Sequence, residues 1–194
     1  MTRAASEVSW YQAAPVTSLR LLNQWAPTHG SLIDVGCGES TLVDSLLDAG
    51  WTDLTTLDVS AQALAQVRGR LGARARQVDF VVADVCSWQP RRTYGVWHDR
   101  AVFHFLVDTA DRNRYLAVVS QALAPGGLAV LGTFAGDGPT QCSGLATARY
   151  DPPEIASLFA PAFVVEHSER EEHVTPAGVL QPFSWVVLRR AIPG

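Results

Sequence analysis

The sequence predicts an α/β protein in which helices cover both faces of a mainly parallel β-sheet. Short apolar runs typical of buried strands alternate with amphipathic segments of helical period along most of the chain. The last two apolar runs instead alternate with polar residues and lie close enough in sequence to pair as an antiparallel hairpin. Strands separated by helices of this length join through right-handed crossovers and therefore pair in parallel.

The spacing of apolar residues predicts the individual helices and strands, and Gly and Pro residues indicate where they begin and end. Leu19, Leu22 and Trp25 recur at helical spacing behind Pro15, which suits a helix start, and Gly50 suits a helix end. Residues 78–85 are almost continuously apolar, as expected of a strand buried on both faces. Helices are therefore expected at residues 16–26, 40–50, 61–72, 111–127 and 152–160. Strands are expected at residues 31–36, 54–60, 78–85, 94–99 and 128–134, with the hairpin strands at 162–174 and 182–190.

Composition limits the classes of function. A chain of 194 residues with 47% apolar and 18% charged residues suits a single globular domain over residues 1–194. The net charge of −4 argues against a general binder of polyanions. Every one of the 15 basic residues is Arg, so no lysine can serve as a general base or form a Schiff base.

Cysteine usage and hydropathy predict the compartment. The three cysteines lie far apart without a C-x-x-C pair, which suits neither a disulfide framework nor a zinc cluster. No segment approaches the roughly 18 uninterrupted apolar residues of a membrane span, and nothing resembles a signal peptide. We therefore expect a cytoplasmic protein without a bound metal, away from membranes, as a monomer or a homodimer.

Carboxylates stand in or at the ends of the first four predicted strands. Asp34, Asp58, Asp84 and Asp99 follow one another at intervals of roughly one strand–helix unit, the last interval being shorter. Ligands of such sheets bind in the crevice outside the carboxyl ends of the strands. These acids are therefore expected to face one site.

The turn after the first strand, "GCGES", restricts the kind of ligand. Gly36 and Gly38 let the backbone approach a ligand closely, because no side chain intervenes. A dinucleotide fingerprint would need a third glycine where Thr41 stands, and a phosphate loop would need a lysine that the chain lacks. The turn therefore argues against both of these common nucleotide sites.

Together, "SLIDVGCGES", "LTTLDVS", Asp84 and "WHDRAVFHFL" resemble the class I S-adenosylmethionine-dependent methyltransferases over roughly residues 16–190. The resemblance implies a Rossmann-like, seven-stranded sheet, S-adenosylmethionine as the cofactor and no metal. It implies that the glycine turn seats the methionine end of the cofactor, that Asp58 accepts hydrogen bonds from the ribose and that Asp84 accepts them from the adenine. The cofactor-binding residues that it implies are Asp34, Gly36, Gly38, Asp58, Val59, Asp84, Val85 and Asp99.

Asp58 and Asp84 could each have a purely structural role instead of binding the cofactor. Asp58 could cap the helix that begins at Ala61, although Ser60 could do the same. Asp84 could cap the turn that follows it.

Within that family, the sequence is similar to a branch containing lysine methyltransferases that act on citrate synthase and on a translation elongation factor, and its uncharacterised bacterial relatives. The fourth-strand motif of those enzymes continues Asp-Lys-Gly-Thr, whereas here Asp99 is followed by Arg100, Ala101 and Val102. This difference favours a small-molecule acceptor over a protein lysine, and both remain open.

Catalysis of methyl transfer needs positioning and at most one base, because a sulfonium is already an activated electrophile. Asp99, which the resemblance places near the acceptor, is one catalytic candidate, and an ion pair with Arg100 is its alternative. His104 is the second candidate, and His98 is a further base to consider, since an imidazole pKa of about 6.5 suits that role. His104 stands among apolar residues, so a buried structural histidine is equally expected.

Two segments are expected to choose the acceptor. Residues 1–15, with Trp10 and Tyr11, are interpreted as a lid that shelters the reaction from water, or alternatively as aromatics packed on the sheet. Residues 132–151 form a long glycine-rich loop in which Cys142 and Arg149 could face the acceptor, and Arg149 would suit a carboxylate. An ordinary loop is the alternative.

The sequence also leaves functions other than methyl transfer open. The arginines at residues 68–76 and 89–92 could contact nucleic acid, but they lack interleaved aromatic residues and are more typical of a solvated face. Among the expected functions, a catalytically silent cofactor-binding or scaffold domain is the main rival, and an NAD-dependent dehydrogenase comes third.

Overall fold

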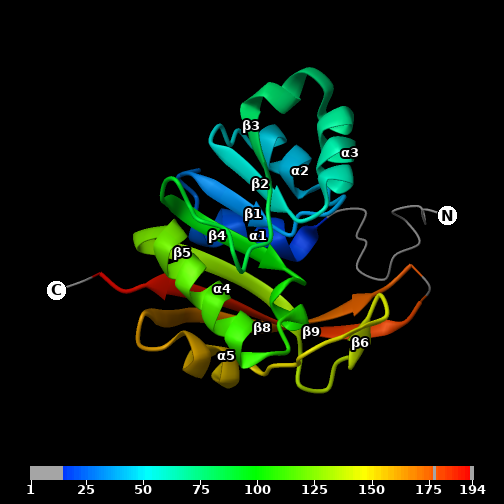
Figure 1. Ribbon diagram of the computed structural model, residues 1–194, viewed down its shortest axis with the longest axis vertical. Helices are drawn as coiled ribbons and strands as arrows, with labels where there is room; N and C mark the ends of the chain where they lie inside the picture. The colour runs from blue at the N-terminus through cyan, green and yellow to red at the C-terminus, as the bar shows by residue number, and fades with distance from the viewer. Residues whose placement is uncertain (1–14, 177, 193–194) are drawn as a thin grey trace.

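The computed structural model describes residues 15–176 and 178–192, and its centre is a seven-stranded sheet with the strand order β3-β2-β1-β4-β5-β9-β8 (Figure 1). The strands are β1 (Leu32–Val35), β2 (Leu54–Asp58), β3 (Val78–Val82), β4 (Tyr94–Arg100), β5 (Leu123–Phe134), β8 (Phe163–Val174) and β9 (Leu180–Arg190). The first five pair in parallel, whereas β9 runs antiparallel to both β5 and β8. The predicted fold class, including the C-terminal hairpin, is confirmed.

Helices pack on both faces of the sheet, and each face has its own apolar core. They are α1 (Val16–Trp25), α2 (Leu42–Asp48), α3 (Ala61–Leu71), α4 (Thr109–Ala122) and α5 (Pro152–Phe159), with short 3₁₀ turns at Gly72–Gln77 and Phe103–Phe105. The apolar residues of α1, α2 and α3 pack in one core, and those of α4 and α5 pack in the other. Leu32 and Ile33, neighbours on β1, belong to opposite cores because successive strand residues point to opposite faces.

Four details differ from the sequence-based expectation. β3 is not buried on both faces, because it is an edge strand that pairs only with β2, and its Val82 is 58% exposed. β9 was expected to alternate between apolar and polar faces, yet it lies between β5 and β8 and contributes Trp185 to one core and Val186 to the other. β5 begins at Leu123, directly after α4, because Pro125 cannot continue a helix. Part of the expected loop at 132–151 forms a small separate hairpin, β6 (Gln141–Cys142) and β7 (Leu145–Ala146).

Candidate functional site

A cavity of about 540 Å³ lies where β1, β2, β3 and β4 end. Its volume falls within the range of about 300–1,000 Å³ that is usual for small-molecule and cofactor sites. The start of α1 closes one side of the cavity through Pro15 and Ser18, and the residues after β4 line another side. The cavity therefore sits at the edge of the sheet where parallel α/β proteins bind ligands.

Seven of the eight cofactor-binding residues that the sequence suggests line this cavity, and they come from three different strand ends. They are Asp34, Gly36, Gly38, Asp58, Val59, Asp84 and Val85. The eighth, Asp99, does not line the cavity, and neither do His104, Cys142 or Arg149. Trp10 and Tyr11, and with them nearly all of the suggested lid, lie outside the described residues.

The glycine turn owes its shape to a left-handed backbone. Gly36 has φ +63° and Gly38 has φ +51°, a region that residues with a side chain rarely adopt. A Cβ atom added to Gly36 would lie 1.9 Å from Cγ2 of Val102, which belongs to the segment after β4. The turn is also tied to β2, because the N–H of Gly36 donates to the carbonyl of Leu57 at 2.7 Å.

Asp58 ends β2 and is only 8% exposed. Its Oδ2 accepts from the N–H of Gly38 at 2.8 Å, and its Oδ1 accepts from the N–H of Ser60 at 2.7 Å. The side chain of Ser60 accepts from Ala63 N and so caps α3, which is the role that the sequence offered as the alternative for Asp58. Since a carboxylate has about four acceptor positions, Asp58 keeps capacity for donors in the cavity.

Two valines line the cavity together with Asp84. Val59 is 73% exposed, Val85 is buried, and both line the cavity. Asp84 itself is exposed, and its Oδ1 accepts from Cys86 N at 2.9 Å, so the turn-capping role expected as an alternative is present too. A carboxylate and two valines on one cavity lining suit a planar ring that carries an amino group.

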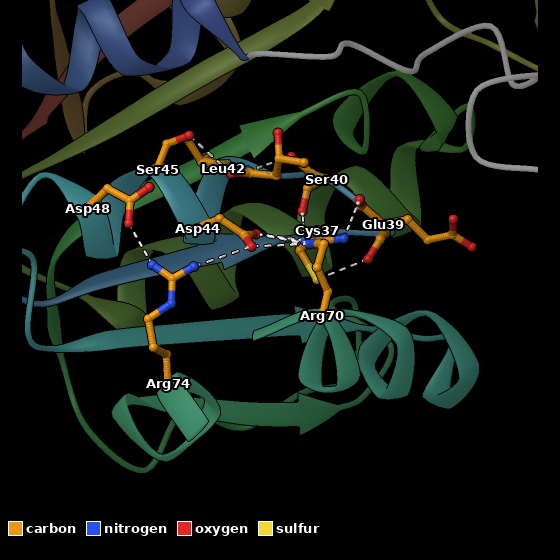
Figure 2. Close-up of polar contacts among 11 residues, drawn as sticks. Cys37, Glu39, Ser40, Leu42, Asp44, Ser45, Asp48, Arg70 and Arg74 are labelled. Carbon is orange, nitrogen blue, oxygen red and sulfur yellow. Dashed lines mark hydrogen bonds and ion pairs between the residues drawn. The ribbon is translucent and has the colours of Figure 1, made fainter. Parts of the chain in front are cut away.

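Two arginines, one from α3 and one from the 3₁₀ turn after it, hold the segment that follows the glycine turn (Figure 2). Arg70 donates from Nη1 to the carbonyl of Glu39 at 3.1 Å and from Nη2 to Oδ2 of Asp44 at 2.8 Å. Arg74 pairs with Asp48 at 2.5 Å. These two arginines of the run at 68–76 thus contact α2 and the loop before it, as a structural rather than a nucleic-acid-binding role requires.

Three buried polar side chains form a hydrogen-bonded chain at the cavity wall. Nδ1 of His98 lies 2.7 Å from Oδ1 of Asp34, and Nε2 of His98 lies 2.9 Å from Oγ of Ser18. All three line the cavity, and their exposed fractions are 2%, 4% and 1% for His98, Asp34 and Ser18. Of the histidines considered as bases, the structure therefore brings His98 to the site.

Asp99 lies on the opposite face of β4 from the cavity. It accepts from the hydroxyl of Tyr115 at 2.5 Å and from Val102 N at 2.9 Å, and burial raises its pKa to about 6. Successive strand residues alternate in direction, so His98 and Arg100 line the cavity while Asp99 packs towards α4. The guanidinium of Arg100 lies 5.0 Å from the ring centre of Phe183. Asp99 holds the segment after β4 in place through its hydrogen bond with Val102 N.

His104 belongs to the apolar packing around β5 and β9. It is fully buried, stacked on Phe134 at 4.2 Å between ring centres, and burial lowers its pKa to about 3. The structure thus matches the alternative of a structural histidine.

Replacing His104 by Phe should stabilise the protein more at pH 5 than at pH 7. The pKa of about 3 in the folded protein lies below the ordinary 6.5, so as the pH falls below 6.5 the unfolded chain binds a proton that the folded chain excludes. Native stability is therefore lost on acidification, and His104→Phe removes this loss, on the order of 2 kcal/mol between pH 7 and 5. Urea unfolding of both proteins at the two pH values measures it, and an equal difference at both would refute the assignment.

The loop at 132–151 does not place its suggested residues at the cavity. Cys142 is buried in the core beneath β9, and Arg149 is exposed. Arg100, considered from the sequence only as a partner for Asp99, is the one arginine among the described residues that line the cavity. Strand alternation shows that His98 and Arg100 share one face of β4, but not that this face meets the cavity, and nothing in the sequence singled out Ser18.

The described part of the chain contains neither a metal-binding cluster nor a membrane-spanning helix. Within residues 15–176 and 178–192, no three His, Cys, Asp or Glu side chains are grouped so that they could hold a metal ion. Over the same residues, no helix has both the length and the apolar character needed to cross a membrane.

Known proteins share both the sequence pattern and the fold. Residues 32–127 match the family model of a methyltransferase domain. The mouse (Mus musculus) eEF1A lysine and N-terminal methyltransferase is 24% identical over 132 residues, which cover 64% of this chain and 19% of that protein. The chain therefore spans about a fifth of the length of the curated relatives it matches.

Solved structures resemble the whole fold. A structure concerned with the conversion of a disulfide bond into a thioacetal group during echinomycin biosynthesis has a TM-score of 0.76 and 20% identity, covering 96% of this chain and 86% of that one. The 1,6-didemethyltoxoflavin-N1-methyltransferase of Burkholderia thailandensis has a TM-score of 0.75 and 22% identity, covering 92% of this chain and 79% of that one. By family match, strand order and motif order together, residues 32–127 of this chain form a domain of the class I S-adenosylmethionine-dependent methyltransferases.

Proposed function

We propose that this protein binds S-adenosylmethionine and transfers its methyl group to a small anionic acceptor. The observation that carries the proposal is the single cavity wall on which the glycine turn, Asp58 and Asp84 meet. The structurally similar toxoflavin methyltransferase is described with bound S-adenosylhomocysteine and a small-molecule substrate, which supports the same use of this fold.

The residues of the cavity fit the cofactor group by group. Asp58 has acceptor capacity for ribose hydroxyls, Val59 and Val85 flank a space for the adenine, and Asp84 can accept from its amino group. Asp34 offers a carboxylate to the cationic amino end. When bound, the cofactor supplies an activated sulfonium methyl group. The chain's own part is to orient the reactants and to keep water away.

The acceptor is expected at the β4 side of the cavity, where the charge reverses. Asp58 and Asp84 make the wall at the ends of β2 and β3 acidic, whereas Arg100, the last residue of β4, lines the cavity beside apolar residues. Burial lowers the pKa of the Arg100 guanidinium from its ordinary value, and the nearby charge of Glu171 opposes this effect. A guanidinium that lines a cavity can donate two parallel hydrogen bonds to a carboxylate, so an acceptor with a carboxylate or a similar group suits this place.

Binding and turnover test the proposal separately. Calorimetric titration should show that S-adenosylhomocysteine binds and that NAD does not; absent binding of the former, or tighter binding of NAD, would overturn it. Labelled methyl transfer into a cell extract should then mark a small molecule that an anion-exchange resin retains. Label in protein would refute the small acceptor, and binding without transfer in any extract would favour a silent cofactor-binding domain.

A further inference from the structure

The chain Ser18–His98–Asp34 joins three elements that are distant in sequence. Asp34 and His98 are register partners on the parallel strands β1 and β4, so the sheet itself sets their side chains next to each other. Ser18 reaches them from α1, on the other side of the imidazole. The ring of Trp185 from β9 lies 6.3 Å from that of His98 and covers it with an apolar surface.

The chemistry of the three groups orders the hydrogen bonds. An ionised carboxylate only accepts, so Nδ1 of His98 carries the hydrogen and donates it to Asp34. In the neutral imidazole Nε2 is then an acceptor, and the hydroxyl of Ser18 donates to it. Ser18 therefore fixes the orientation of the His98 ring, and His98 fixes that of the Asp34 carboxylate. Residues behind a ligand-binding side chain commonly orient it in this way.

Asp34 keeps capacity for a further donor. The bond from His98 uses Oδ1, and a carboxylate has about four acceptor positions. Asp34 lines the cavity beside the glycine turn while its charge is almost wholly buried. Burying a carboxylate is costly unless donors surround it, so a cationic donor in the cavity would complete its environment.

We propose that Ser18 and His98 are positioning residues that hold the Asp34 carboxylate towards the cationic amino group of the cofactor and couple cofactor binding to the docking of α1. The proposal rests on the proposed function above. Ser18 can donate to His98 only while α1 is packed against the sheet. Packing of α1 therefore favours the orientation of Asp34 in which its carboxylate can bind the amino group of the cofactor. By thermodynamic reciprocity, bound cofactor must stabilise α1 to the same extent.

Two ligands separate this role from general damage. S-adenosylhomocysteine carries the amino acid end, whereas 5′-methylthioadenosine keeps adenine and ribose but has no amino group. His98→Leu, which keeps the volume and removes both nitrogens, should weaken S-adenosylhomocysteine binding by about tenfold or more and leave 5′-methylthioadenosine binding nearly unchanged. Asp34→Asn should show the same pattern, and the double variant should lose much less than the sum of both effects.

Two milder variants isolate the link to α1. Ser18→Ala removes only the bond to His98, and His98→Asn keeps a donor for Asp34 while losing contact with Ser18. In the wild type, S-adenosylhomocysteine should slow hydrogen exchange at the buried Leu21 and Leu22 of α1. In both variants this slowing should largely disappear, although circular dichroism and the affinity for 5′-methylthioadenosine stay the same.

The possible failures are distinguishable. If the wild type does not bind S-adenosylhomocysteine, the proposed function itself is wrong. If the wild type binds it and His98→Leu and Ser18→Ala behave like the wild type with both ligands, the positioning role is refuted. Equal losses for both ligands would also refute it, because they would indicate a merely structural role. If His98→Leu does not fold, Ser18→Ala and His98→Asn still decide the matter.

Discussion

Gly36→Ala should lower the free energy of unfolding by about 2–5 kcal/mol. The left-handed φ of +63° costs a residue with a Cβ about 1–2 kcal/mol. The new atom would in addition lie 1.9 Å from Cγ2 of Val102, and such overpacking typically costs about 1–3 kcal/mol. Urea unfolding measures the sum, and cofactor binding should be lost with it because the turn lines the cavity.

A matched glycine provides the control for this experiment. Gly69 lies within α3, and a Cβ added there would meet no atom within 4 Å. Gly69→Ala should therefore stabilise the protein by about 0.5–1 kcal/mol, since alanine is the better helix former. Adding Val102→Ala to Gly36→Ala should recover the overpacking part and leave the backbone strain. A Gly36→Ala protein as stable as the wild type would show that the turn takes another conformation.

Asp58→Ala should weaken the binding of S-adenosylhomocysteine by well over tenfold. Hydrogen bonds to a charged acceptor are worth about 1.5–3 kcal/mol each, and two ribose hydroxyls would lose theirs. The substitution also removes the acceptor for Gly38 N, which loosens the glycine turn. Calorimetric titration measures the change.

The ligand pattern identifies which part of the cofactor Asp58 binds. 5′-Methylthioadenosine retains the ribose, so Asp58→Ala should weaken it as strongly as S-adenosylhomocysteine, unlike the variants of Asp34 and His98. Asp58→Asn keeps one oxygen as an acceptor and should lose less. An unchanged dissociation constant in a folded Asp58→Ala protein would show that the ribose assignment is wrong.

The sequence predicted the sheet and its ligand-binding edge because local patterns specify both. The strand ends bring Asp34, Asp58 and Asp84 to one cavity, as strands of a parallel sheet must do. Those patterns do not determine which face of β4 each residue occupies. Asp99 was placed at the site, yet it points to the other core, while its neighbours His98 and Arg100 reach the cavity.

Contacts between distant segments were not predictable from local patterns. Ser18 and His98 are 80 residues apart in the sequence, and only the packing of α1 on the sheet brings them into contact. The buried environment of His104 likewise depends on β5 and β9, which supply Phe134 and Phe183. Helical spacing and strand period contain no information about such pairings.

The clamp that Arg70 forms on the loop after β1 also affects the energetics of ligand binding. A guanidinium that holds the carbonyl of Glu39 and the side chain of Asp44 removes backbone freedom before any ligand arrives. The ligand then meets a cavity wall that is already ordered and loses less conformational entropy when it binds. The adenosine part of every such ligand should consequently gain the same benefit from this ordered loop, so that differences in affinity arise from the groups beyond the adenosine, at Asp34 and around Arg100.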